Sequence, residues 1–231
     1  MINAVLTIDD IASKNTPALV DYLVEKGIKA LMFAVGTHVE KYPENVIYAL
    51  GRGMIVGNHS YSHPNFAEIS FEEGIKEIKK TDALLDDIYK QAGVERKYKP
   101  FRFPYGSKGG ENKERYEQYF RDNGYSKLDD RNIKYPWWKE CGLDKDIDTL
   151  WTFDFAEYNI RPQSGFTMED VLKRIHDSNP ASGGTLLDEG SNHIILMHDH
   201  EETLAMVPDY YMIMIEHVLE NGVTFAAPTF I

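Results

Sequence analysis

Several features are scarce or missing in this chain of 231 residues, and each absence excludes a class of protein. Cys141 is the only cysteine, so no disulfide can form within the chain. No apolar run approaches the ~20 residues that a membrane-spanning helix needs, and no repeat or low-complexity segment is visible. Positive charge is also scarce, because 25 Lys and Arg stand against 37 Asp and Glu.

The resulting formal charge of −12 bears on the kind of partner that the protein binds. It argues against nucleic acid or another polyanion as the main partner and favours a neutral or cationic one. The first residues run directly into an apolar segment and leave no room for a signal peptide. We therefore expect a cytoplasmic protein by default, and a cell-envelope or secreted one if a leader has been removed. The sequence indicates no oligomeric state.

What is present fits one globular α/β domain over residues 1–231. Amphipathic segments typical of helices alternate with short apolar segments typical of strands. Helices are expected at 16–26, 43–50, 71–91, 111–123, 168–178 and 203–220. Strands are expected at 2–8, 29–35, 54–56, 101–103, 149–155, 193–197 and 223–226. About seven βα units predict a distorted (β/α)7-type barrel, with the active site at the carboxyl ends of its strands.

The most informative residues follow the first and third of these strands. Asp9 and Asp10 close the first, and His59 and His63 follow the third with a spacing that stacks both imidazoles on one side of a turn. One carboxylate and two imidazoles suit a divalent metal with positions left open for water and substrate, and the second carboxylate suits a general base. Each pattern is weak alone, but together they predict a metallohydrolase.

Residues 129–148 interrupt the alternation and are expected to be an insertion near the active-site mouth. They contain the neighbouring Trp137 and Trp138. Indole rings suit stacking on sugar faces, although tryptophan packs more often in a core or at its rim. Both residues are therefore candidates for substrate binding.

Polar clusters also follow three later strands. Arg102 to Gly106 end one strand, Asp154 to Tyr158 end another, and His198 to His200 end a third. Five polar groups on five strand ends can converge only if they share one barrel mouth.

With these motifs the sequence resembles the NodB-homology polysaccharide deacetylases of carbohydrate esterase family 4, over most of its length. Residues 7–10 (TIDD) resemble the first family motif, usually TFDD, and residues 59–63 (HSYSH) resemble the second, H(S/T)xxH. Residues 102–106 (RFPYG) resemble the third, RxPYG, and residues 196–199 (LMHD) resemble the fifth. The four motifs occur in the family's order.

The resemblance implies a role for each candidate residue. Asp10, His59 and His63 would bind the metal, in the first place Zn²⁺, with Co²⁺, Ni²⁺ or another divalent ion as alternatives. Asp9 would take the proton of the attacking water, and Arg102 would hold Asp9 in its charged form.

The other implied roles concern the leaving group and the substrate. His198 would protonate the leaving amine, and the backbone N–H of Tyr105 would bind the oxyanion. Pro104 and Tyr105, in the third motif, would contact the substrate.

Two places depart from the family pattern. Ile11 and Ala12 follow the first motif, where many members continue with Gly-Pro, so the loop beside the base is shaped differently. The fourth motif, usually DxxDW, reads DFAEY at residues 154–158. The partner of His198 is therefore open between Glu157 and Asp154.

The implied function is the metal-dependent removal of N-acetyl groups from N-acetylhexosamine units of a polysaccharide or oligosaccharide, with release of acetate. The same scaffold acting on another amide or ester, as an O-acetyl esterase, a deformylase or a cyclic amidase, stays open. So does a catalytically silent glycan-binding domain. An iron oxygenase with two histidines and one carboxylate is less favoured, because it gives Asp9, Arg102 and His198 no role.

Overall fold

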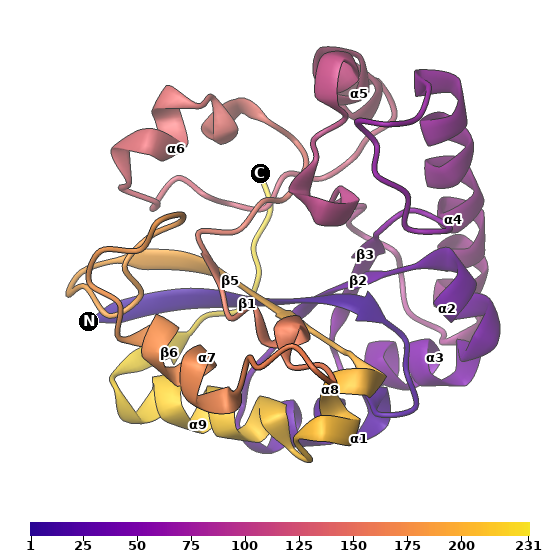
Figure 1. Ribbon diagram of the computed structural model, residues 1–231. Coiled ribbons are helices and arrows are strands. Elements are labelled where there is room, and N and C mark those ends of the chain that lie inside the picture. The colour runs from indigo at the N-terminus through magenta and orange to yellow at the C-terminus, as the bar shows by residue number, and fades with distance from the viewer.

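The computed structural model describes residues 1–231 and shows a parallel sheet surrounded by helices (Figure 1). The sheet runs in the order β3 (Ile55–Asn58), β2 (Leu31–Ala34), β1 (Ile2–Ile11), β5 (Asn192–His198) and β4 (Phe153–Asp154). A further strand, β6 (Val223–Phe225), pairs with the beginning of β1. Every pairing is parallel, so the carboxyl ends of the strands gather on one side of the molecule.

β3 and β4 form the two edges of this sheet. Isolated contacts, and not a continuous ladder of hydrogen bonds, connect these edges. Phe101 forms a single parallel bridge to Asn58 at the end of β3. The carbonyl of Phe101 accepts a 2.8 Å hydrogen bond from the N–H of Thr149, shortly before β4. The expected strand at 101–103 is thus reduced to one bridge, since Pro100 and Pro104 lack the N–H groups of a longer ladder. The predicted α/β class and distorted barrel are confirmed, with six strands where seven were expected.

Alternate side chains of β1 face opposite sides of the sheet. Leu6 and Ile8 are fully buried in the main hydrophobic cluster, which packs the outer face of the sheet against the helices. Thr7 and Asp9 point into the barrel, where both accept hydrogen bonds from Arg102. The carboxyl half of the barrel interior is therefore polar, while the amino half is filled by apolar side chains such as Leu31 and Ile194.

Five helices lie where the sequence predicts them: α1 (Thr16–Glu25), α3 (Pro43–Gly51), α4 (Phe71–Gln91), α5 (Lys113–Asp122) and α7 (Met168–Ile175). A sixth, α9 (Tyr210–Glu220), covers only the second part of the helix expected at 203–220. Three short helices were not expected: α2 (Gly36–Lys41), α6 (Pro136–Glu140) and α8 (Glu201–Met206). Four 3₁₀ turns connect elements: Pro104–Gly106, Gly110–Asn112, Leu143–Lys145 and Glu157–Asn159. None of the helices has the length and apolar character needed to cross a bilayer.

The prediction of one continuous helix over 203–220 is wrong. The segment is divided between α8 and α9, with Pro208 and Asp209 in the break. Proline has no N–H to continue a helix and clashes with the preceding turn, and Asp209 adopts a left-handed conformation with φ of 61°. The break turns the chain between α8, which follows β5, and α9.

Most of the segment 129–148 lies at the amino-terminal ends of the strands, and its helix α6 appears on the side where β1 begins (Figure 1). Trp138 belongs to a hydrophobic cluster that also contains Leu31 and Ile194. Its side chain is 2% exposed, and its indole N–H donates a hydrogen bond to Asp130. Trp138 therefore packs the floor of the barrel and has no ring face free for a sugar, contrary to the expectation of a substrate-binding role.

We expect Ile8→Ala to lower the free energy of unfolding by about 2 to 5 kcal/mol, because Ile8 is fully buried in the main cluster and its loss leaves a cavity. Urea denaturation followed by circular dichroism measures the change. The matched control is Ile213→Ala on α9, where the side chain is 39% exposed and the loss should be about 1 kcal/mol or less. Equal losses in the two variants would contradict the packing described here.

Candidate active site

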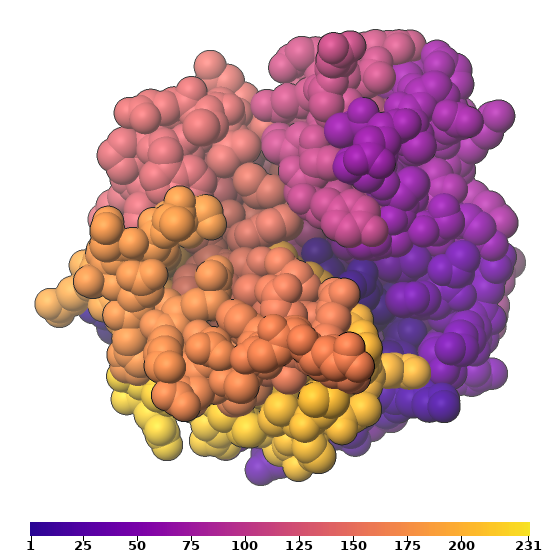
Figure 2. Space-filling model, in the orientation of Figure 1, coloured from indigo at the N-terminus to yellow at the C-terminus, as the bar shows by residue number.

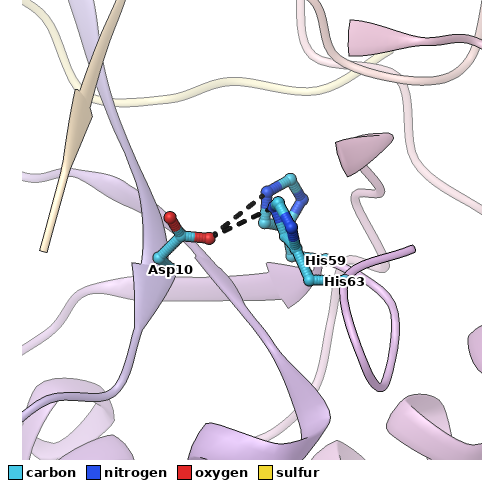
Figure 3. A group of neighbouring side chains, drawn as sticks. All are labelled: Asp10, His59 and His63. Carbon is cyan, nitrogen blue, oxygen red and sulfur yellow. Dashed lines mark ion pairs between the residues drawn. The ribbon is translucent and has the colours of Figure 1, made fainter. Parts of the chain in front are cut away.

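Asp10, His59 and His63 converge at the carboxyl end of β1 (Figure 3). Oδ1 of Asp10 lies 3.4 Å from Nε2 of His63 and 3.8 Å from Nε2 of His59. Figure 3 shows the carboxylate facing both imidazoles across a small gap. One carboxylate oxygen and two imidazole nitrogens in this arrangement fit a divalent metal ion.

The backbone of β1 explains why two consecutive carboxylates serve one site. In a regular strand Asp9 and Asp10 would point to opposite faces. The pairing of β1 with β2 shifts register between Ile8 and Ile11, and Asp10 adopts a left-handed conformation with φ of 66°. A non-glycine residue pays a conformational cost there, and such outliers are typical of functional sites. The irregularity brings the Asp10 side chain round to the histidines.

His59 is oriented by the backbone of the third motif. Its Nδ1 lies 2.8 Å from the carbonyl oxygen of Arg102, and only an N–H can bond to that acceptor. In the neutral ring this tautomer leaves the lone pair of Nε2 for a metal. The side chain is buried, so the orientation is fixed by packing as well.

His63 occupies a more open position, with its ring edge-on to that of Tyr105 at a centroid distance of 4.7 Å. Burial, together with the neighbouring His59, lowers the pKa of His63 to about 4. The imidazole is therefore neutral at pH 7, the form that binds a metal. Burial alone would raise the pKa of Asp10, but the surrounding histidines, led by His198, lower it. Both groups are thus in the protonation state that a metal ligand needs.

Asp9 is held by a fully buried arginine. Nη1 of Arg102 donates hydrogen bonds to Oδ1 of Asp9 at 2.8 Å and to Oγ1 of Thr7 at 2.9 Å. Nε of Arg102 donates to the carbonyl of Thr149 at 2.9 Å. The other oxygen of Asp9 faces the candidate metal site, 3.4 Å from Nε2 of His59. One oxygen of Asp9 is therefore fixed while the second is available to accept a proton.

His198 ends β5, beside Asp9 on the neighbouring β1, and pairs with Glu157. Its Nδ1 is 3.2 Å from Oε1 of Glu157, which also accepts the backbone N–H of His198. Burial alone would lower the pKa of His198, but the Glu157 carboxylate raises it to about 10. Asp154 forms no hydrogen bond with His198 and instead accepts the N–H of Ala156. Of the two partners that the sequence left open, the structure pairs Glu157 with His198.

The local fold explains this choice. Ala156 adopts a left-handed conformation with φ of 57° and starts the 3₁₀ turn Glu157–Asn159, which carries Glu157 beneath His198. Asp154, at the end of β4, lies on the wall of the pocket, where burial raises its pKa to about 6.

The candidate groups line one pocket of about 380 Å³, which we call the reaction pocket. It contains Asp9, Asp10, His59, His63, Tyr105, Trp151, Asp154, Tyr158, Arg161, Leu196, His198 and His200. The ring of Tyr105 is 69% exposed at its rim. Pro104, also expected to contact the substrate, is buried and does not line the pocket, and it starts the turn that presents Tyr105.

Some residues that contribute to the site are not identified by the sequence motifs. Trp151 lies in the expected strand 149–155 but was not assigned to the pocket, and since it precedes the observed strand β4, strand alternation does not identify it. His38 belongs to none of the motifs, yet its Nδ1 lies 2.8 Å from the carbonyl of Asp10. Asp199 accepts hydrogen bonds from Ser13 and Thr16. Together these bonds fix the loop that follows the two carboxylates.

Comparisons with known proteins all indicate similarity to deacetylases. A family model described as "Polysaccharide deacetylase" matches residues 3–127. A peptidoglycan-N-acetylglucosamine deacetylase of Bacillus cereus is 37% identical over 91 residues, which are 39% of this chain and 31% of that protein. A chitooligosaccharide deacetylase of Rhizobium leguminosarum bv. trifolii is 31% identical over 94 residues, 40% of this chain and 44% of that protein. These alignments span less than half the length of either relative.

The fold has solved counterparts as well. The crystal structure of a polysaccharide deacetylase from Bacillus cereus superposes with a TM-score of 0.65 at 24% sequence identity. The superposition covers 98% of this chain and 92% of that one. At this level of identity the likeness concerns the fold, which is shared over nearly the whole chain.

We expect Glu157→Gln to lower the pKa of His198 by about one pH unit or more in the metal-free protein, because the nearby carboxylate favours the charged imidazole. The folded pKa of about 10 exceeds the ordinary value of 6.5, so the imidazolium stabilises the fold fully below about pH 6.5. This contribution to stability is lost as the pH rises through 10. In Glu157→Gln the stability should therefore depend less on pH. Imidazole NMR titration measures the pKa.

The matched control is Asp154→Asn, which removes a carboxylate from the same wall without breaking a hydrogen bond to His198. A larger pKa change in the control than in Glu157→Gln would contradict the assigned pairing.

Proposed function

Because the chain belongs to the polysaccharide deacetylase family, we propose that it is a metal-dependent hydrolase that removes N-acetyl groups from N-acetylhexosamine units of a glycan and releases acetate. The observation that carries the proposal is the reaction pocket itself. Asp9, beside three candidate metal ligands, lines the same cavity as His198, which is paired with the buried Glu157. The two curated relatives are named for peptidoglycan N-acetylglucosamine and chitooligosaccharides, which share the N-acetyl amide.

Asp10, His59 and His63 would hold the metal ion. A carboxylate with two neutral imidazoles suits Zn²⁺ first and accepts Co²⁺ or Ni²⁺. When bound, a divalent ion polarises the amide carbonyl and lowers the pKa of the attacking water. The three protein ligands leave positions for both of these groups.

Asp9 would act as the general base. Its Oδ2 faces the ligand cluster, and its Oδ1 is held by Arg102, so the carboxylate is oriented before substrate arrives. Arg102 is a positioning residue in this proposal, since it acts through Asp9.

His198 would act as the general acid. An amine leaves poorly as an anion, so the C–N bond breaks only as the nitrogen gains a proton. The Glu157 carboxylate on Nδ1 keeps the imidazole charged and leaves Nε2–H as the proton to be donated. The backbone N–H of Tyr105, which has no acceptor within the protein, would donate to the developing oxyanion. Acid and base are thus different residues, at the ends of the neighbouring strands β5 and β1.

The direct test is acetate release from N-acetylglucosamine oligomers by the Zn²⁺-loaded protein, compared with acetylated xylan, a formylated amine and small cyclic amides. We expect turnover of the N-acetylated sugars, and Asp9→Asn should reduce it by about a hundredfold or more, because the base is lost while the shape is kept.

The control Asp87→Asn replaces an exposed carboxylate on α4 and should leave turnover unchanged. Turnover of the esters or cyclic amides alone would refute the proposed substrate. Wild-type rates in Asp9→Asn would refute the proposed base.

A further inference from the structure

The turn over residues 59–63, which we call the histidine turn, has an unfavourable backbone conformation. It begins with one candidate metal ligand, His59, and ends with another, His63. Ser60 and His63 are both left-handed, with φ of 66° and 58°. Residues with a side chain pay a conformational cost there, so the turn keeps this shape only where surrounding groups hold it.

The two histidines differ in how their rings are oriented. The ring of His59 is buried and bonded through Nδ1 to the carbonyl of Arg102. The side chain of His63 is 25% exposed, and apart from its approach to Asp10 the ring has no polar partner in the chain. The direction of the His63 imidazole therefore depends on the backbone of the histidine turn.

The helix α2 holds one side of the histidine turn. The N–H of Gly36, at the start of α2, donates to the carbonyl of Ser60 at 2.9 Å. The N–H of Thr37 donates to the carbonyl of Tyr61 at the same distance. A Cβ on Gly36 would lie 2.5 Å from the ring of Tyr61, so glycine allows this close approach. The carbonyl groups of the turn are thus bonded to α2.

The helix α4 holds the other side through one carboxylate, that of Glu77. Its Oε2 accepts the backbone N–H of Tyr61 at 3.0 Å and that of Ser62 at 2.6 Å. Its Oε1 accepts the hydroxyl of Ser62 at 3.0 Å. Hydrogen bonds to a charged acceptor are about twice as strong as those between neutral groups. A single half-buried side chain, outside every sequence motif, therefore supplies three acceptor contacts to the turn.

Other contacts fix α4 relative to the histidine turn. The side chain of Asn58, at the end of β3, donates to the carbonyl of Ile78 at 2.9 Å. The hydroxyl of Tyr61 donates to Glu40 on α2 at 2.8 Å, and Nζ of Lys80 on α4 lies 3.3 Å from the centre of the same ring. Figure 2 shows the purple part of the chain that contains α2 and α4 as one continuous surface at the right. Glu77 is thus presented from a helix with a fixed position.

We propose that Glu77 is a positioning residue of the metal centre, which holds the histidine turn so that His63 points at the ion bound by Asp10 and His59. Glu77 does not line the reaction pocket, so it acts through the turn. The proposal rests on the proposed function, from which it takes the three ligands. Without Glu77 the N–H groups of Tyr61 and Ser62 lose their acceptor, the turn relaxes, and the metal is bound more weakly.

The test measures the affinity for Zn²⁺ by competition with a chromogenic chelator, in the absence of substrate. Glu77→Ala should weaken the affinity by about tenfold to a hundredfold, as is typical when a group that orients a metal ligand is lost. Glu77→Gln should keep most of the affinity, because its amide oxygen accepts both N–H groups and its amide nitrogen donates to the Ser62 hydroxyl. Glu77→Asp keeps the charge but is one methylene too short, so it should bind Zn²⁺ nearly as weakly as Glu77→Ala.

This order of the variants separates position from charge. If Glu77 acted on the metal only by its negative charge, Glu77→Asp would keep the affinity and Glu77→Gln would lose it. The visible absorption spectrum of the Co²⁺-loaded protein gives a second readout, since it changes when a histidine ligand is displaced. It should change in Glu77→Ala and in Glu77→Asp. The matched control is Asp87→Ala, which removes an exposed carboxylate bonded only within α4 and should change neither readout.

The outcomes distinguish this proposal from the proposed function. If Glu77→Ala and Glu77→Asp bind Zn²⁺ as tightly as the wild type, the role of Glu77 is refuted and the proposed function stands. If the variants follow the expected order but the wild type releases no acetate from N-acetylated sugars, the proposed function fails and the role of Glu77 stands. A wild type that binds no divalent ion would overturn both. If Glu77→Ala does not fold, the contrast between Glu77→Asp and Glu77→Gln still decides.

Discussion

The buried guanidinium of Arg102 is the interaction on which the rest of the site depends. Its Nη1 holds Asp9 and Thr7 on β1, its Nε holds the chain at Thr149, and its carbonyl fixes the ring of His59. A charge buried this completely is costly unless it is paired and hydrogen-bonded, and here the pairing partner is the proposed base. One residue thus joins the weakly paired edge of the barrel to the proposed base and a candidate metal ligand.

This arrangement also separates the roles of two neighbouring carboxylates. Asp9 stays on the regular face of β1, where Arg102 occupies one of its oxygens. Asp10 is turned by its left-handed backbone toward the histidines, and His38 binds its carbonyl. Identical side chains thus acquire different hydrogen-bond partners and different positions in the site from their surroundings, the usual way in which one site holds both a base and a metal ligand. The second pair, His198 with Glu157, places the proposed acid at the end of the neighbouring strand β5.

Much of this was predictable because the motifs have local causes. A buried β-branched strand that ends in Asp9 and Asp10 marks the carboxyl edge of a parallel sheet, and the histidine spacing marks one side of a turn. The ligand set therefore follows from the sequence. The choice of Glu157 over Asp154 does not, because it depends on the left-handed turn at Ala156. Trp137 lines a pocket, whereas Trp138 is buried in a hydrophobic cluster. This difference depends on how α6 packs against the rest of the fold, which is set by tertiary contacts.

The central claim is that Asp10, His59 and His63 bind one divalent ion while Asp9 remains on Arg102 as the base. A crystal structure of the Zn²⁺-bound protein tests it most directly, with the ion located by anomalous scattering. The account predicts an ion about 2.0 to 2.2 Å from Asp10, His59 and His63, with Asp9 outside its coordination shell and still hydrogen-bonded to Arg102. An ion bound through Asp9, or histidines that ligate at separate places, would contradict it.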